Sequence, residues 1–336
     1  MNASYNLKTF SKMSMKFIRK SAGILVVSAI IGASLHAQDR NDVIKAYNEG
    51  AKSAQTDPSS AIKAFETVIT LSEKVGESSA DLKQKAMQVL PGLYIKVAVA
   101  AMNEKKPFPE IMKTAKTAVK VAEKYGTQTH KDNASKIMVQ AYNTMATTYF
   151  GQNDFQNALT SFDSLLMLNP GYINAIYNKA LIFIKQNNAT AFEQTIDSYL
   201  EKVKAANDEL KIKQASTMAL EYFRSAGSKA NQEEKPDEAL ALLNKAAKYG
   251  DDKDLFYYFA DVYNKQKNFN SGAEYAKRGL DLETGVAEAK AKFWFQLGLA
   301  QSGKGQIADA CVSFKNSTYG AFVEASKAER KNLKCQ

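Results

Sequence analysis

Histidine and cysteine are scarce in this sequence. Its 336 residues include two histidines, His36 and His130, and two cysteines, Cys311 and Cys335. So few ligands exclude a metal site built from several His and Cys side chains. Once the leader described below is removed, a Ser-His-Asp or Cys-His catalytic arrangement would have to use His130. This residue stands in the polar stretch TQTHKDN, where we expect it to face solvent. We therefore expect no enzyme activity, no metal and no cofactor.

Runs of Val, Ile and Thr bounded by turn residues, which are typical of β-strands, are also scarce. With 45% hydrophobic residues, 6 Pro and 17 Gly, the chain is neither disordered nor collagenous. Ala, Lys, Leu, Glu and Gln dominate the sequence instead, and these residues favour α-helix. The composition predicts an all-α protein.

Long apolar stretches are limited to one uncharged run over residues 21–35. It follows five basic residues and precedes Ala37, the pattern of a secretory signal peptide over residues 1–37. The run is shorter than the roughly 20 residues that a transmembrane helix needs. We expect cleavage after Ala37, with either Met1 or Met15 as the start and no transmembrane segment in the mature chain. An uncleaved N-terminal anchor is the alternative.

Acidic residues are fewer than basic ones, and the formal net charge is +10. Removing the five basic residues of the leader leaves 40 basic residues against 35 acidic, a net charge of +5. The remaining Lys and Glu are interspersed, as on solvated helix faces. They form no clustered basic stripe, so a nucleic-acid partner is not expected.

Two short helices are predicted within residues 139–170, VQAYNTMATTYFGQNDFQNALTSFDSLLMLNP. In each helix apolar residues recur at three- and four-residue spacing. A Gly-Gln-Asn turn separates the helices, and Asn-Pro ends the second. Small residues at Ala146 and Ala158 would let the two backbones approach, while Tyr149 and Phe162 fill the space around the contact.

This order of large, small, Tyr, Ala, Phe and Pro resembles the tetratricopeptide repeat (TPR). Similar units begin near Ile173, near Leu220 and 33 residues after that, and the last contains Trp294. Five units from residue 139 to about residue 317 thus resemble the repeat. The gap between the second and third is 47 residues, so about 13 extra residues should lengthen the helices around residues 201–218.

The part before His130 resembles the repeat less closely. Helical pairs are readable over residues 42–76 and 79–125, with Asp57 predicted as an N-cap before a proline at the first helical position. Pro91 is expected to kink or break its helix. A polar connection is expected over residues 126–132.

The resemblance implies an all-α, TPR-like right-handed superhelix, an α-solenoid of about seven helix pairs of which the first two are divergent. The expected organisation is a signal peptide over residues 1–37, divergent N-terminal repeats over 38–132, TPR-like repeats over 133–318, and a C-terminal solvating helix with its tail over 319–336.

The resemblance also implies a binding surface. On the family pattern, the residue after the first large apolar residue of each unit points into the concave groove. These residues are Asn143, Tyr177, Arg224, Tyr257 and Phe295. Three aromatics, an Arg and an Asn are similar to a peptide-binding ladder. Alternatively, Tyr177 and Phe295 are core residues.

The sequence therefore favours an exported, non-catalytic scaffold of the bacterial cell envelope, periplasmic or envelope-associated, that binds a protein or peptide segment. The alternative is a glycan- or peptidoglycan-associated module, because aromatic ladders also stack on sugars.

The two cysteines have two readings. An exported chain can oxidise Cys311 and Cys335 to a disulfide that stabilises the end of the chain. Alternatively, Cys311 is a small buried residue and Cys335 a free thiol in the tail.

Overall fold

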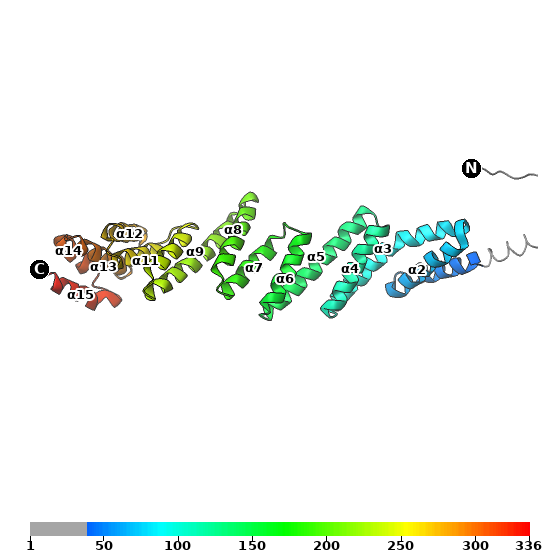
Figure 1. The fold of residues 1–336 in the computed structure, drawn as a ribbon, viewed down its shortest axis with the longest axis horizontal. Helices are drawn as coiled ribbons and strands as arrows, with labels where there is room; N and C mark the ends of the chain where they lie inside the picture. Colours follow the sequence, from blue (N-terminus) through cyan, green and yellow to red (C-terminus); the bar gives the residue numbers. More distant parts are fainter. Residues whose placement is uncertain (1–38) are drawn as a thin grey trace, which may run out of the picture. The chain divides into compact units, whose positions relative to one another are not determined.

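The computed structural model describes residues 39–336, and every regular element in this range is a helix (Figure 1). The predicted signal peptide lies outside the described residues. Residues 39–53 are helical. The labelled α-helices are α2 (Pro58–Val75), α3 (Ala80–Asn103), α4 (Phe108–Tyr125), α5 (Gln128–Gly151), α6 (Phe155–Leu168), α7 (Ile173–Lys185), α8 (Ala189–Ala205), α9 (Glu209–Gln232), α10 (Pro236–Ala247), α11 (Lys253–Lys265), α12 (Phe269–Leu282), α13 (Ala287–Gly303), α14 (Ile307–Asn316) and α15 (Val323–Asn332). Short 3₁₀ helices are η1 (Gly76–Ser79) and η2 (Gly320–Phe322). The prediction of an all-α solenoid is confirmed.

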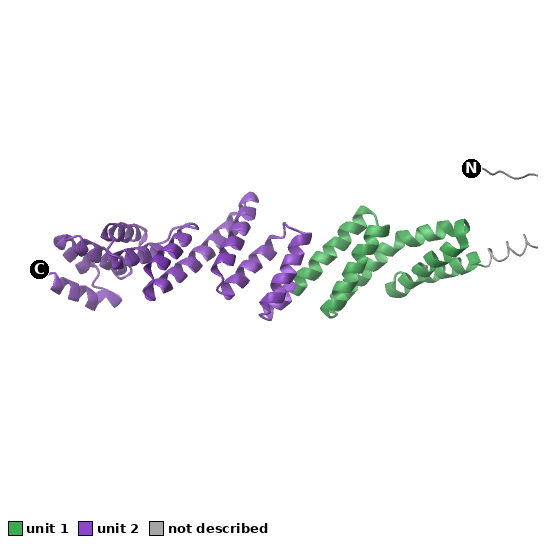
Figure 2. Cartoon of the chain, viewed as in Figure 1, with its two compact units in different colours: residues 1–145 green, residues 146–336 purple. Residues whose placement is uncertain are grey.

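The chain forms two compact units, whose boundary falls within α5 (Figure 2). Unit 1 ends at Met145 and unit 2 runs from Ala146 to Gln336. In unit 1, α3 packs against both α2 and α4. In unit 2, successive helices pack as pairs, among them α7 with α8, α9 with α10, α11 with α12, and α13 with α14. Across the described residues, no helix combines the length and apolarity needed to span a bilayer.

One turn geometry recurs between the helices of each pair in unit 2. A residue with positive φ is followed by the N-cap of the next helix, as with Asn153 before Asp154 and Asn187 before Asn188. At Asp154, Asn188 and Asn268 the cap side chain accepts a hydrogen bond from the backbone N–H three residues on. The N–H of the cap residue donates to the carbonyl five residues back, which satisfies the end of the preceding helix. The turn therefore reverses the chain within a few residues.

Small residues allow close packing within the pairs, as the repeat pattern predicted. A Cβ built on Gly50 would lie 3.0 Å from the ring of Phe65. A Cβ on Gly227 would lie 2.8 Å from Leu243, and one on Gly298 would lie 2.8 Å from Phe314. In each case a residue of the first helix of a pair lies against a large, buried residue of the second.

The extra residues between the second and third clear units lengthen two helices, as predicted. The helix α8 has 17 residues and α9 has 24. Asp208 caps α9 by accepting a hydrogen bond from the N–H of Lys211. Most of the insertion is thus regular helix rather than loop.

Two expectations about the N-terminal part need correction. The helix α3 continues through Pro91, which is buried within it, so the helix is not broken there. The expected polar connection over residues 126–132 is shorter than predicted, because α5 already begins at Gln128. His130 lies in the first turn of α5 and is half-buried, and its Nδ1 accepts a hydrogen bond from the N–H of Thr127. The polar residues of this segment are compatible with a helix because the side chains of Thr127 and His130 hydrogen-bond to backbone N–H groups at its start.

Candidate functional site

The five predicted ladder residues lie on the first helices of successive pairs. Asn143 is on α5 in unit 1, whereas Tyr177, Arg224, Tyr257 and Phe295 lie in unit 2 on α7, α9, α11 and α13. All five side chains are half-buried. The structure links two of them, Arg224 and Tyr257, through charged residues that the sequence prediction did not include.

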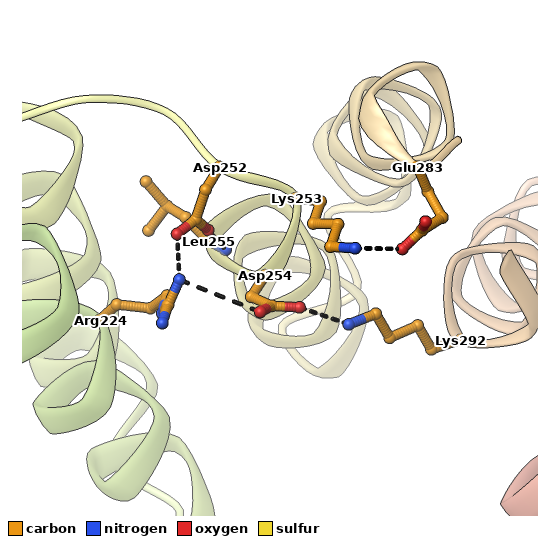
Figure 3. Close-up of polar contacts among 7 residues, drawn as sticks. All are labelled: Arg224, Asp252, Lys253, Asp254, Leu255, Glu283 and Lys292. Carbon is orange, nitrogen blue, oxygen red and sulfur yellow. Dashed lines mark hydrogen bonds and ion pairs between the residues drawn. The ribbon is translucent and has the colours of Figure 1, made fainter. Parts of the chain in front are cut away.

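Charged side chains of α9, α11 and α13 form a row across these three helices, which we call the charged rung (Figure 3). The guanidinium of Arg224 forms an ion pair with Asp252 and lies 4.0 Å from a carboxylate oxygen of Asp254. The ammonium of Lys292 binds the other oxygen of Asp254. The carboxylate of Asp254 on α11 therefore lies between two positive charges, one from α9 and one from α13.

The pKa of Asp254 reflects its partners. Burial alone would raise this pKa, but the hydrogen bond and charge of Lys292 and the charge of Arg224 outweigh burial and lower it. Asp254 therefore stays ionised at neutral pH and the rung keeps its alternating charges.

A second ion pair joins α11 to the end of α12 beside this rung (Figure 3). The ammonium of Lys253 lies 2.7 Å from Glu283, whose side chain is buried. The other carboxylate oxygen of Glu283 accepts a hydrogen bond from the N–H of Gly285 at 2.8 Å. The Lys253 hydrogen bond and then the Gly285 bond lower the pKa of Glu283.

A second row of side chains, in which amides predominate, lies two helical turns further along the same helices; we call it the amide rung. Asp261 follows Asp254 by seven residues, and Asn231 follows Arg224 by seven, so each pair shares a helix face. Asp261 accepts hydrogen bonds from Asn231 Nδ2 at 2.5 Å and from Gln296 Nε2 at 3.0 Å. It also pairs with Lys265 at 3.0 Å.

Tyr257 lies on α11 between the two rungs in sequence. Its ring contacts Tyr258 and Phe293 edge-on, with centroid distances of 5.3 and 6.3 Å. The ammonium of Lys292 lies 5.4 Å from its centroid. Burial, and then the Asp261 carboxylate, raise the pKa of Tyr257, so the phenol stays protonated at neutral pH. We call Arg224, Asp254, Lys292, Tyr257, Asn231, Asp261 and Gln296 the polar ladder.

The structure does not bring the other predicted aromatics into the polar ladder. Tyr177 packs against Tyr199 of α8, with ring centroids 5.2 Å apart. Phe295 packs against Phe314 of α14 and Phe322 of η2 at 5.6 and 5.3 Å. The C-terminal segment thus contacts Phe295, which favours a packing role for this residue.

We next consider metal ligands and cysteines in the part of the chain that the structure describes. Over residues 39–336 no group of three or more His, Cys, Asp and Glu side chains is placed to hold a metal ion. Cys311 on α14 and Cys335 near the C-terminus form a disulfide, with Cα atoms 5.6 Å apart. This bond attaches the end of the chain to the last helix pair.

Comparisons with known proteins gave one family match and several similar solved structures. Residues 139–172 match the tetratricopeptide repeat family. No curated protein matches the sequence. A solved tetratricopeptide repeat protein from Parabacteroides merdae is 16% identical, covering 88% of this chain and 99% of that one, with a TM-score of 0.30.

Two further solved structures are similar at the same low level. YrrB, described as a TPR protein with an unusual peptide-binding site, is 16% identical over 53% of this chain and 84% of its own, with a TM-score of 0.31. PilW, described as a type IV pilus biogenesis factor, is 20% identical over 56% of this chain and 78% of its own, with a TM-score of 0.27.

Repeated helix pairs place the chain in the class of all-α solenoids. The match shows a tetratricopeptide repeat over residues 139–172 of this chain. This family is generally non-catalytic, and its fold suggests a scaffold for protein–protein interaction.

Proposed function

We propose that this protein is an exported scaffold that binds a protein or peptide segment along the polar ladder of unit 2. The observation that carries the proposal is the alternation of charged and amide groups across α9, α11 and α13. These groups are held in place by one another, so little side-chain freedom is lost when a ligand binds. The partly exposed, pre-ordered charges of Arg224, Asp254 and Lys292 suit an extended backbone, whose N–H and C=O groups need partners.

The arrangement supports a peptide better than a glycan. A sugar ring stacks on an open aromatic face. Phe295 is already in contact with Phe314 and Phe322, and Lys292 lies over Tyr257. Asn231 and Gln296 are buried, whereas Arg224, Asp254 and Lys292 keep part of their side chains exposed, so these charged groups offer more to a ligand than the rings do.

The cell-envelope location rests on the leader predicted over residues 1–37. A bacterial periplasm is oxidising enough to form disulfides, which fits the bond between Cys311 and Cys335. The envelope assignment and the binding surface are separate parts of the proposal.

A capture experiment with paired variants tests the binding surface. Mature protein immobilised on beads would be exposed to envelope extract, and bound proteins identified by mass spectrometry. Asp261→Lys reverses a charge in the polar ladder, whereas Asp281→Lys makes the same change at an exposed site on α12. Each variant would first be checked for native helix content by circular dichroism.

We expect a specific partner to be retained by wild type and Asp281→Lys and lost with Asp261→Lys. For the purified partner, truncating a true anchor such as Arg224 should cost roughly 2 kcal/mol of binding free energy. A partner that binds both charge-reversal variants equally would show that the polar ladder is not the site.

A further inference from the structure

Unit 1 has a valley formed by three helices. The helices α2 and α4 both pack on α3. Two adjoining cavities of about 490 and 660 Å³ lie over these helices, and both are lined by Tyr94 and Thr117. We call this surface the α3 valley. None of its residues belongs to the polar ladder of unit 2.

The floor of the α3 valley is apolar with one fixed hydroxyl. Leu90, Tyr94 and Val97 of α3 line it at three- and four-residue spacing, so they share one helix face. Leu90 is buried, and Tyr94 and Val97 are half-buried and form the accessible part of the floor. The Tyr94 hydroxyl donates a hydrogen bond to Glu66 of α2 at 2.5 Å. Burial, and then the Glu66 bond, raise the pKa of Tyr94, so this hydroxyl remains a donor at neutral pH. The carboxylate of Glu66 is therefore hydrogen-bonded to Tyr94 of the valley floor.

The α4 wall of the valley is basic. Lining residues on α4 extend from Pro109 to Tyr125, which corresponds to about 24 Å of helix. They include Lys113, Lys120 and Lys124, and no ion pair involves any of the three within the described part of unit 1. Glu110 contributes a carboxylate at the N-terminal end of this wall. Along the rest of α4, the lysines leave positive charge beside an apolar floor.

We propose that the α3 valley binds an acidic amphipathic helix of a protein partner. The apolar side of such a helix would pack on the half-buried Tyr94 and Val97, and its carboxylates would meet the lysines of α4. Helices commonly bind in grooves through anchors at this spacing, and charge complementarity would select an acidic one. The inference concerns a different unit from the proposed function and does not depend on it.

Two designed peptides of 18 residues test the inference. Both carry the same leucine stripe on one helical face, and the flanking positions are Glu in one peptide and Lys in the other. Binding of each labelled peptide to the mature full chain would be measured by fluorescence anisotropy. Lys120→Glu changes the valley, and Lys116→Glu is the matched control, because it is an exposed lysine of the same helix that does not line either cavity.

We expect the Glu peptide to bind at least about tenfold more tightly than the Lys peptide. Lys120→Glu should weaken binding of the Glu peptide by about three- to tenfold, while Lys116→Glu should leave the affinity for this peptide within about twofold of the wild-type value. Circular dichroism would show that both variants remain folded. The inference would be overturned by equal affinity for the two peptides, or by an equal effect of the two substitutions.

Discussion

Arg224 of α9 forms an ion pair with Asp252, the residue that caps the N-terminus of α11. Asp252 uses its other carboxylate oxygen to accept a hydrogen bond from the N–H of Leu255 at 2.6 Å (Figure 3). One side chain therefore starts a helix and joins it to the preceding helix pair. A repeat protein depends on such contacts between neighbouring units, because no pair buries its apolar surface alone.

Asp254, two residues after Asp252, should make the stability of the fold depend on pH in the acid range. Its pKa in the folded protein is below the value of 3.8 for an unperturbed aspartate. A lowered pKa stabilises the fold above about pH 4, and the contribution is lost as pH falls through the folded value. Asp254→Asn should therefore cost about 1 kcal/mol in unfolding free energy at pH 7, since the site is partly exposed.

Urea unfolding of wild type and Asp254→Asn at pH 7 and at pH 3 would measure this effect. The difference between the two proteins should shrink at pH 3, because the carboxyl of Asp254 in the unfolded chain, with the ordinary pKa of 3.8, is then mostly protonated and the unfolded state gains stability. Asp281→Asn is a control, because no ion pair involves Asp281 in the described residues. A difference for Asp254→Asn that stays constant with pH would contradict the electrostatic explanation.

Gly279 should be intolerant of a side chain. A Cβ at this position would lie 2.3 Å from the ring of Phe293, which is fully buried and has little room to move. Gly279→Ala should therefore lower the unfolding free energy by about 1–3 kcal/mol. Gly151→Ala is the matched control, since nothing lies within 4 Å of its Cβ and it ends a helix. Chemical denaturation should leave the control equal to wild type or slightly more stable; equal loss in both would show that the close approach to Phe293 is not the cause.

Local rules were enough to predict most of the fold from sequence. The cap at Asp57 and the burial of Ala158 and Phe162 follow from neighbours within one helix pair. The start of α5 was missed because local hydrogen bonds between Thr127 and His130 support a helix start in this polar segment. The helix α3 is not broken at the buried Pro91, where tertiary packing outweighs the local preference of proline.

The candidate site was predicted less completely, because its contacts join different repeats. The repeat pattern predicted Arg224 and Tyr257 as groove residues, but it did not include Asp254 and Lys292, which contact them. One available signal was the seven-residue spacing of polar residues on two first helices, Arg224 with Asn231 and Asp254 with Asp261. Which charges pair depends on how one helix sits against the next, and the sequence pattern of a single helix does not contain this.

Export can be tested by sequencing the N-terminus of protein purified from its native host. The basic, apolar and small-residue order of residues 1–37 predicts a mature chain that begins at Gln38 or within a few residues of it. The same sample should come from the periplasmic or envelope fraction. Intact leader on protein from the cytosolic fraction would contradict export, and intact leader in the membrane fraction would favour the uncleaved anchor.

The disulfide between Cys311 and Cys335 should be both complete and stabilising. It closes a sequence separation of 24 residues, which in the chain-entropy account stabilises the fold by about 3 kcal/mol. Thiol titration of oxidised, denatured protein should find no free thiol, and Cys335→Ser should unfold at a lower urea concentration. Reductant should destabilise wild type and leave Cys335→Ser unchanged, because the variant has no bond to lose. Two free thiols per chain would instead support a separate Cys311 and tail thiol, and a dimer that reductant dissociates would indicate pairing between chains.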